Sequence, residues 1–257
     1  MNLFKVIILS IMVIFFLSCI NYHNLRNTEK KILVKKKSWD DIISNCYYIN
    51  LARSTDRKIY MENMLEKCKI PYERFNAIEG KDQVKMYKNL NISVGALGCK
   101  LSHLELLKKV KNNGWTIIFE DDILIDESRP VKEEIIDFIS TLPSDAELVL
   151  FGTSPRCLWW NISTFGFKNH SNNIWSSKRN LSCAHAYAIN YTGAQKWIKH
   201  IKRNLCIQPF DMHSKGIDTI YLCLKEKGNM FQDLSYITQN KDKFGYFDSL
   251  VTEYPFM

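Results

Sequence analysis

The stretch GWTIIFEDDILID, residues 114–126, joins an apolar run to three consecutive carboxylates. Residues 116–119 carry the β-branched and aromatic side chains typical of a buried strand, and Glu120, Asp121 and Asp122 follow directly. Adjacent like charges repel one another, so a cation or strong hydrogen bonds must compensate them if they stay ionised. Because side chains alternate along a strand, we expect Glu120 and Asp122 on one face and Asp121 on the other.

The segments around this strand alternate between strand and helix patterns. Further strands are predicted at CYYINL (46–51), YERFNAIEG (72–80), AELVLFG (146–152) and AHAYAIN (184–190). Helices are predicted over residues 54–68, 93–113, 131–140, 191–204 and 215–229. The pattern indicates a single-domain α/β fold whose mostly parallel sheet is flanked by helices, and ligands of such sheets bind beyond the carboxyl ends of the strands.

Two details of this pattern are specific enough to check. In the helix over 54–68, with Ser54 or Thr55 as its N-cap, the predicted inward face consists of Ile59, Met64, Leu65 and Cys68. Residues 153–183 show no clear period, so we expect a long loop there, in which three tryptophans (159, 160 and 175) could stack on a ligand or pack as a lid.

The first 45 residues differ from the rest of the chain. Residues 6–20 form an apolar run of signal-peptide length, and we expect residues 1–20 to be a signal peptide or signal-anchor. Residues 21–45 are polar and basic and are expected to be a stem, so the catalytic domain would span 46–257. We expect the secretory pathway (endoplasmic reticulum or Golgi lumen), or the exported or membrane compartment of a bacterium, with membrane anchoring through the N-terminus left open.

Composition excludes several classes of protein. The chain has 46% apolar and 24% charged residues, as globular proteins do, and its net charge is +8, with six of the basic residues crowded between Arg26 and Lys37. No aromatic-basic pattern accompanies that charge, so nucleic acid is not an expected partner. The dispersed cysteines include no C-x-x-C pair, which disfavours zinc held by sulfur alone. Five N-x-S/T sequons, the first at Asn91, are compatible with a secreted glycoprotein.

Several motifs, taken in order, resemble glycosyltransferase family 25. GCKLSH (98–103) stands a short helix ahead of IIFEDD, and YYINLARSTDR, PYERFNAIEGKD, AYAINYTGAQKWI, PFD and YITQN occur in the family's order between about residues 46 and 240. The family contains bacterial lipopolysaccharide and animal collagen galactosyltransferases. The resemblance implies the GT-A nucleotide-sugar transferase fold, with a divalent cation held against the donor diphosphate at the acidic strand end.

The residues expected at the site follow from the acidic triplet together with this resemblance. Two carboxylates two residues apart make a hard-oxygen site for Mn²⁺ or Mg²⁺. Asp122 is the expected direct ligand, and Glu120 or Asp121 would assist or hold the ribose. The expected nucleotide contacts are Asn50, Arg53, Arg57, Ser102, His103 and Asp121. His103 could instead be a hydrogen-bonded core residue, and Cys99 is interpreted as packing.

The expected activity is transfer of a hexose, galactose or glucose, from a UDP-sugar to a glycan or protein acceptor. The family's β-galactosyl products imply inversion, which needs one base near the acceptor hydroxyl. Asp211 is the candidate base, with His213 as the alternative, and Asp211 could also complete the metal site. The rival interpretations are a catalytically silent relative that binds glycans or cell surfaces, and a cation-dependent phosphotransferase, which the absence of a Gly-rich phosphate loop disfavours.

Overall fold

The computed structural model describes residues 37–87, 90–152, 167–171, 174–177, 184–203, 220–223 and 238–239. The chain divides into two units, residues 1–37 and 38–257, and every helix and strand described here belongs to the second. The apolar run at 6–20, the stem to residue 36, Trp159, Trp160, Asp211 and His213 lie outside the described residues. Within the described part of the chain, no helix has the length and apolar character that crossing a membrane requires.

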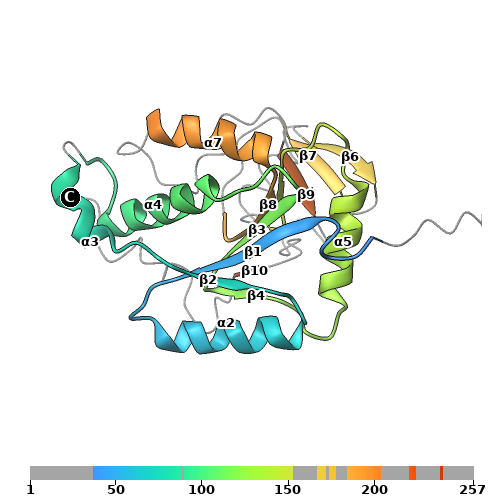
Figure 1. The fold of residues 1–257 in the computed structure, drawn as a ribbon, viewed down its shortest axis with the longest axis horizontal. Coiled ribbons are helices and arrows are strands. Elements are labelled where there is room, and N and C mark those ends of the chain that lie inside the picture. The colour runs from blue at the N-terminus through green and yellow to red at the C-terminus, as the bar shows by residue number, and fades with distance from the viewer. Residues whose placement is uncertain are drawn as a thin grey trace, which may run out of the picture. The chain divides into compact units, whose positions relative to one another are not determined.

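Helices and strands alternate along the first half of the unit (Figure 1). The helices are α2 (Thr55–Lys67), α3 (Gly80–Gln83), the 3₁₀ helix η1 (Val84–Met86), α4 (Val94–Lys108), α5 (Val131–Thr141) and α7 (Tyr191–Arg203). The strands are β1 (Ile43–Asn50), β2 (Glu73–Asn76), β3 (Trp115–Glu120), β4 (Ile123–Leu124), β5 (Leu148–Leu150), β6 (Phe167–Ser171), β7 (Ile174–Ser177), β8 (Ala186–Ile189), β9 (Ile220–Cys223) and β10 (Thr238–Gln239).

Eight of these strands form one mixed sheet in the order β2-β1-β3-β8-β5-β9-β7-β6. β1 is parallel to β2 and β3, and β5 is parallel to β9, whereas β8 is antiparallel to β3 and β5, and β7 is antiparallel to β9 and β6. Six strands therefore share one direction and β8 and β7 oppose it, which agrees with the mostly parallel sheet expected. β10 pairs with β4 in a separate two-stranded sheet.

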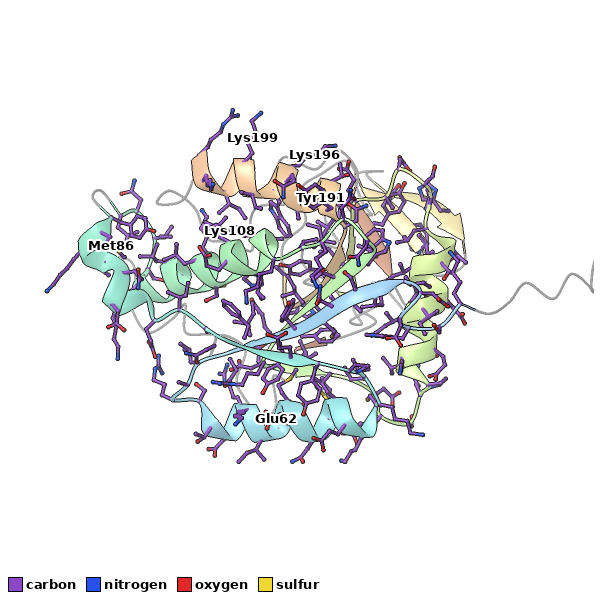
Figure 2. The ribbon with its side chains drawn as sticks, viewed as in Figure 1. Glu62, Met86, Lys108, Tyr191, Lys196 and Lys199 are labelled. Atoms are coloured by element: carbon purple, nitrogen blue, oxygen red, sulfur yellow. The ribbon has the colours of Figure 1, made fainter. Side chains whose placement is uncertain are left out.

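Helices cover both faces of the sheet, and alternate residues of β3 point to different helices. Ile117 and Phe119 pack in one core cluster with residues of α2 and α5. Ile118 packs in a second cluster with residues of α4 and α7. Figure 1 shows α2 on one side of the central strands and α4 with α7 on the other. Exposed side chains lie on the outer sides of these helices. Lys199 on α7 and Met86 in η1, for example, point away from the sheet (Figure 2).

Three predictions about secondary structure are wrong. Residues 220–223, expected within a helix, form strand β9 between β5 and β7, because the run Ile-Tyr-Leu-Cys fills an interior place in the sheet. Part of the expected loop 153–183 is a β-hairpin, β6 with β7. On α2, Ile59 is 58% exposed and Met61 is fully buried in its place. Ile59 lies two positions from Met61, which on a helix means nearly opposite sides.

Candidate functional site

The acidic triplet lies at the carboxyl end of β3, the third strand from one edge of the sheet. Asp121 and Asp122 are 7% and 8% exposed, and the Glu120 side chain is 20% exposed. The backbone N–H of Glu120 donates to the carbonyl of His185 at 2.8 Å, which ties this end of β3 to the chain just before β8. Three carboxylates are therefore concentrated in a small, largely desolvated volume.

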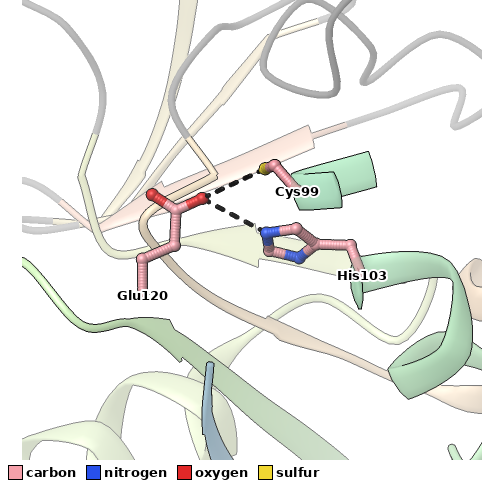
Figure 3. Close-up of side chains that lie close together, drawn as sticks. All are labelled: Cys99, His103 and Glu120. Carbon is pink, nitrogen blue, oxygen red and sulfur yellow. Dashed lines mark hydrogen bonds and ion pairs between the residues drawn. The ribbon is translucent and has the colours of Figure 1, made fainter. Parts of the chain in front are cut away.

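Glu120 and Asp121 contact opposite faces of the sheet, as strand alternation predicts. Glu120 is two residues after Ile118, so its side chain points to the same face of the sheet, toward α4. Its Oε1 lies 3.2 Å from His103 Nε2 and 3.8 Å from Cys99 Sγ (Figure 3). Asp121 is two residues after Phe119, so its side chain points to the other face, where it contacts Arg57 of α2. The two neighbouring acids therefore belong to separate hydrogen-bonding networks.

Asp121 is held by a cation and an amide. Arg57 Nη1 donates to its Oδ1 at 3.1 Å, and Asn50 Nδ2 donates to its Oδ2 at 2.7 Å. The side chains of the ion pair are 14% and 10% exposed. Burial raises the pKa of Asp121 above its usual value, while the Arg57 charge and the Asn50 hydrogen bond oppose that rise. Both oxygens of this carboxylate are engaged.

Asn50 is fixed from the neighbouring strand. Arg74 Nε donates to Asn50 Oδ1 at 3.0 Å, and Asn50 Nδ2 also donates to the carbonyl of Ser54. Sequence reasoning missed Arg74. The signal that could have found it is the parallel register of β1 and β2, which sets Tyr48 beside Arg74 and Asn50 beside Asn76 where both strands end.

Glu120 lies next to two side chains of α4, those of His103 and Cys99. Its pKa is raised to about 7, chiefly by burial and then by the charge of Asp121, while the Cys99 hydrogen bond and Arg57 lower it. His103 is buried, and its other ring nitrogen, Nδ1, lies 3.0 Å from the Tyr187 hydroxyl. Burial also keeps the pKa of Tyr187 well above its ordinary value, so this tyrosine stays protonated. His103 is thus a hydrogen-bonded core residue that also contacts the triplet.

Of the other predicted residues, Arg53 and Ser102 have no described hydrogen bond to the triplet, whereas Cys99 has one. Arg53 is 46% exposed and pairs with Glu79 at 2.9 Å. The Ser102 hydroxyl donates to the Gly98 carbonyl at 2.7 Å and accepts from Ile78 N at 2.8 Å, so it joins α4 to the turn before α3. Cys99 packs against the second core cluster, as interpreted, and in addition contacts Glu120. Trp175 on β7 packs partly against that same cluster.

Two sets of possible metal ligands meet at Glu120. The carboxylates of the triplet supply the hard oxygens that Mn²⁺ and Mg²⁺ prefer, and a nearby cation would favour the ionised form of acids whose pKa values are raised. The triplet offers the donor type of a hard divalent cation, although its three carboxylates are not among the described groups whose ligand atoms all lie within 4.8 Å of one another. Among the described residues, Cys99, His103 and Glu120 form a second set, whose ligand atoms all lie within 4.8 Å of one another.

Comparisons with known proteins bear on this arrangement. The sequence model of glycosyltransferase family 25, described as an LPS biosynthesis protein family, matches residues 43–213, about two thirds of the chain. No curated protein matches the chain significantly. One solved structure, titled a glycosyltransferase involved in the glycosylation of the major capsid of PBCV-1, superposes with a TM-score of 0.38 at 9% identity, covering 67% of this chain and 70% of the other. A likeness this weak carries no conclusion about this chain.

Proposed function

Because the chain belongs to glycosyltransferase family 25 and is a glycosyltransferase, we propose that it moves a hexose, galactose or glucose, from a UDP-sugar to a glycan or protein acceptor with inversion. We further propose that transfer requires Mn²⁺ or Mg²⁺. The observation that carries this proposal is the group of three carboxylates at the carboxyl end of β3, where burial raises the pKa of Glu120 and Asp121. Such a group is stabilised by a divalent cation.

The contacts suggest which of the three acids would bind the cation and which would bind the nucleotide. Arg57 already balances the charge of Asp121, and Asn50 holds its second oxygen, so Asp121 suits a fixed hydrogen-bonding role toward the nucleotide. Asp122 and Glu120 would then hold the cation. A bound divalent cation acts as a Lewis acid that neutralises the charge of the leaving diphosphate.

The remaining roles stay with the residues expected from the sequence. Asn50 ends β1, Arg53 and Arg57 follow it closely, and these residues would bind the nucleotide, since guanidinium groups pair well with phosphate oxygens. Ser102 and His103 of α4 complete the proposed donor side. Asp211, outside the described residues, remains the proposed base for the acceptor hydroxyl.

The test is transfer from a panel of UDP-sugars with Mn²⁺ or Mg²⁺, comparing wild type with Asp122→Asn. We expect the variant to lose at least about 100-fold in rate, because removal of a metal ligand costs several times ~1.4 kcal/mol, the free energy of each tenfold loss. Unfolding by urea without metal should hardly change, since the substitution keeps the shape of the side chain.

Glu127→Gln is the matched control. Glu127 is a nearby acid that pairs with Lys67 on the surface, with side chains 40% and 64% exposed. Its substitution should leave transfer intact. Near-normal transfer by Asp122→Asn would refute the metal role of Asp122, and a chain inactive with every UDP-sugar would argue for the glycan-binding alternative.

A further inference from the structure

Cys99, His103 and Glu120 present three different ligand atoms to one small volume. Cys99 and His103 are four residues apart on α4, and side chains at this spacing lie one above the other on the same helix face. Figure 3 shows that both side chains point at the same oxygen of Glu120, the last residue of β3. Sulfur, imidazole nitrogen and carboxylate oxygen all lie within 4.8 Å of one another.

The helix is held firmly in the position that creates this arrangement. One residue before Cys99, a Cβ on Gly98 would lie 2.5 Å from the carbonyl oxygen of Ile78, so only glycine allows α4 to approach the turn this closely. One residue before His103, Ser102 bonds to the backbone N–H of the same Ile78. The pair at 98 and 102 fixes the helix to the turn, and the pair at 99 and 103 consequently faces Glu120.

Two of the three separations between ligand atoms are close to the edges of a zinc tetrahedron, and the third, from sulfur to nitrogen, is at most 4.8 Å. With bonds of about 2.0 Å to nitrogen and oxygen and about 2.3 Å to sulfur, a zinc tetrahedron has edges of about 3.3 Å between N and O and about 3.5 Å between S and O. The structure has 3.2 Å and 3.8 Å for these two edges. These three side chains would supply three of the four ligands of a tetrahedral zinc ion.

We propose that Cys99, His103 and Glu120 form a zinc site, distinct in chemistry from the hard-oxygen site of the triplet. Thiolate and imidazole select zinc over magnesium and manganese. Binding would release to solvent the Cys99 thiol proton and any proton on Glu120, and His103 would coordinate through Nε2 with its one ring proton on Nδ1. Both Cys99 and Glu120 are partly exposed, which gives the ion a route to its ligands.

Tyr187 supplies the outer partner that such a histidine needs. A histidine that binds metal donates its other N–H to an oxygen, which fixes the ring and its tautomer. The Tyr187 hydroxyl lies 3.0 Å from His103 Nδ1, and its ring stacks near the imidazole with centroids 5.7 Å apart. Tyr187 is therefore already positioned to accept the hydrogen bond from the His103 nitrogen that would not bind zinc.

The zinc site has a consequence for transfer that rests on the proposed function. Glu120 belongs to both ligand sets, so zinc bound to Cys99 and His103 withdraws Glu120 from the cation that serves the donor. Zinc would then inhibit at concentrations where Mn²⁺ activates, and Cys99→Ser would relieve that inhibition.

The test uses the full chain, reduced and freed of metal, titrated with Co²⁺ as a coloured substitute for zinc. We expect the visible bands of a tetrahedral site together with a near-ultraviolet thiolate-to-cobalt band, and equimolar Zn²⁺ should abolish both. Cys99→Ser should lose the thiolate band, whereas Cys68→Ser, which alters a buried cysteine outside the cluster, should keep it. Tyr187→Phe should keep the band and weaken cobalt affinity by about 10- to 100-fold.

These optical measurements do not depend on any transferase activity, so they can fail while the proposed function stands. Absence of the thiolate band in wild type, or its persistence in Cys99→Ser, would overturn the zinc site. Glu120→Gln, which keeps the shape of the side chain, gives a second test if Cys99→Ser does not fold. It should weaken cobalt binding at least about tenfold, and an unchanged affinity would equally overturn the proposal.

Discussion

Glu120 and Asp121 are neighbours in the sequence, yet they belong to different halves of the site. Asp121 faces α2, where a guanidinium and an amide hold both of its oxygens. Glu120 faces α4, where its described partners are an imidazole and a thiol. Burial raises the pKa of both acids, and the Arg57 charge opposes that rise at both, but the hydrogen bond described for the Arg57 guanidinium goes to Asp121.

The difference shows that consecutive acids at the end of a strand can have different surroundings. Alternation of side chains places one acid in a preformed ion pair and leaves its neighbour among ligands that carry no fixed positive charge. The charge of Asp121 is therefore already compensated in the folded protein, whereas a bound cation would further stabilise the ionised form of Glu120. Three substitutions test this asymmetry, taken here from the largest expected effect on stability to the smallest.

Arg57→Met should destabilise the protein by about 3 kcal/mol, because removal of one partner leaves the buried Asp121 carboxylate without its cation. The measurement is urea unfolding at neutral pH. The matched control is Arg53→Met, which breaks the more exposed pair with Glu79 and should cost less than about 1 kcal/mol.

A second variant checks the cause of that loss. Asp121→Asn added to Arg57→Met removes the stranded charge and should recover most of the lost stability. If the double variant is as unstable as Arg57→Met alone, the loss arises from packing of the Arg57 side chain and not from its charge.

Glu120→Gln should change how stability depends on pH in the absence of metal. The pKa of Glu120 rises from its ordinary 4.5 to about 7 in the folded protein, so the folded state holds more protons than the unfolded state between these values. Stability should consequently fall as pH rises from 4.5 to 7, by an amount on the order of 2–3 kcal/mol. The glutamine variant should lose most of this fall, with a smaller one of the same sign remaining from Asp121.

Urea unfolding with a chelator present, at half-unit steps from pH 4.5 to 8, measures this dependence. Saturating Mn²⁺ should flatten the wild-type profile, because the cation favours the ionised carboxylate. An identical pH dependence in wild type and Glu120→Gln would show that Glu120 titrates near its ordinary value.

Tyr187→Phe should have the smallest effect, about 1 kcal/mol, because it removes one hydrogen bond to His103 and keeps the ring that packs on Trp197. Tyr48→Phe is a matched control, since it removes a similar hydrogen bond from a buried tyrosine to Glu62. NMR of labelled histidine should show an altered tautomer balance at His103 in Tyr187→Phe alone. The same spectrum in both variants would mean that Tyr187 does not set the tautomer.

The sequence predicts the central part of the fold well because local patterns and the global fold agree there. Apolar runs and the helical periods beside them identify β1, α2, α4 and β3, and the place of the triplet follows from where its strand ends. Strand β9 was missed because a run of four apolar residues fits a helix and a strand equally. Its assignment depends on β5 and β7, partners distant in the sequence, which local periodicity does not report.

The site divides in the same way between local and distant information. Alternation along β3 correctly separates Glu120 from Asp121, and the spacing of Arg57 after β1 brings it within reach of the strand end. The order of strands, however, determines which partner each acid meets. Arg74 and Tyr187 enter the site from β2 and β8, and only the register of the sheet relates them to Asn50 and His103.

The most direct test of the central claim, that the end of β3 binds a cation together with a nucleoside diphosphate, is thermal unfolding with Mn²⁺, UDP or both. We predict that the two ligands together raise the unfolding temperature by more than the sum of their separate shifts. The diphosphate fills positions that the carboxylates leave open on the cation, a coupling typically worth ~1–3 kcal/mol. Asp122→Asn should abolish the excess. Shifts that merely add, or no shift at all, would contradict the claim and favour a glycan-binding protein.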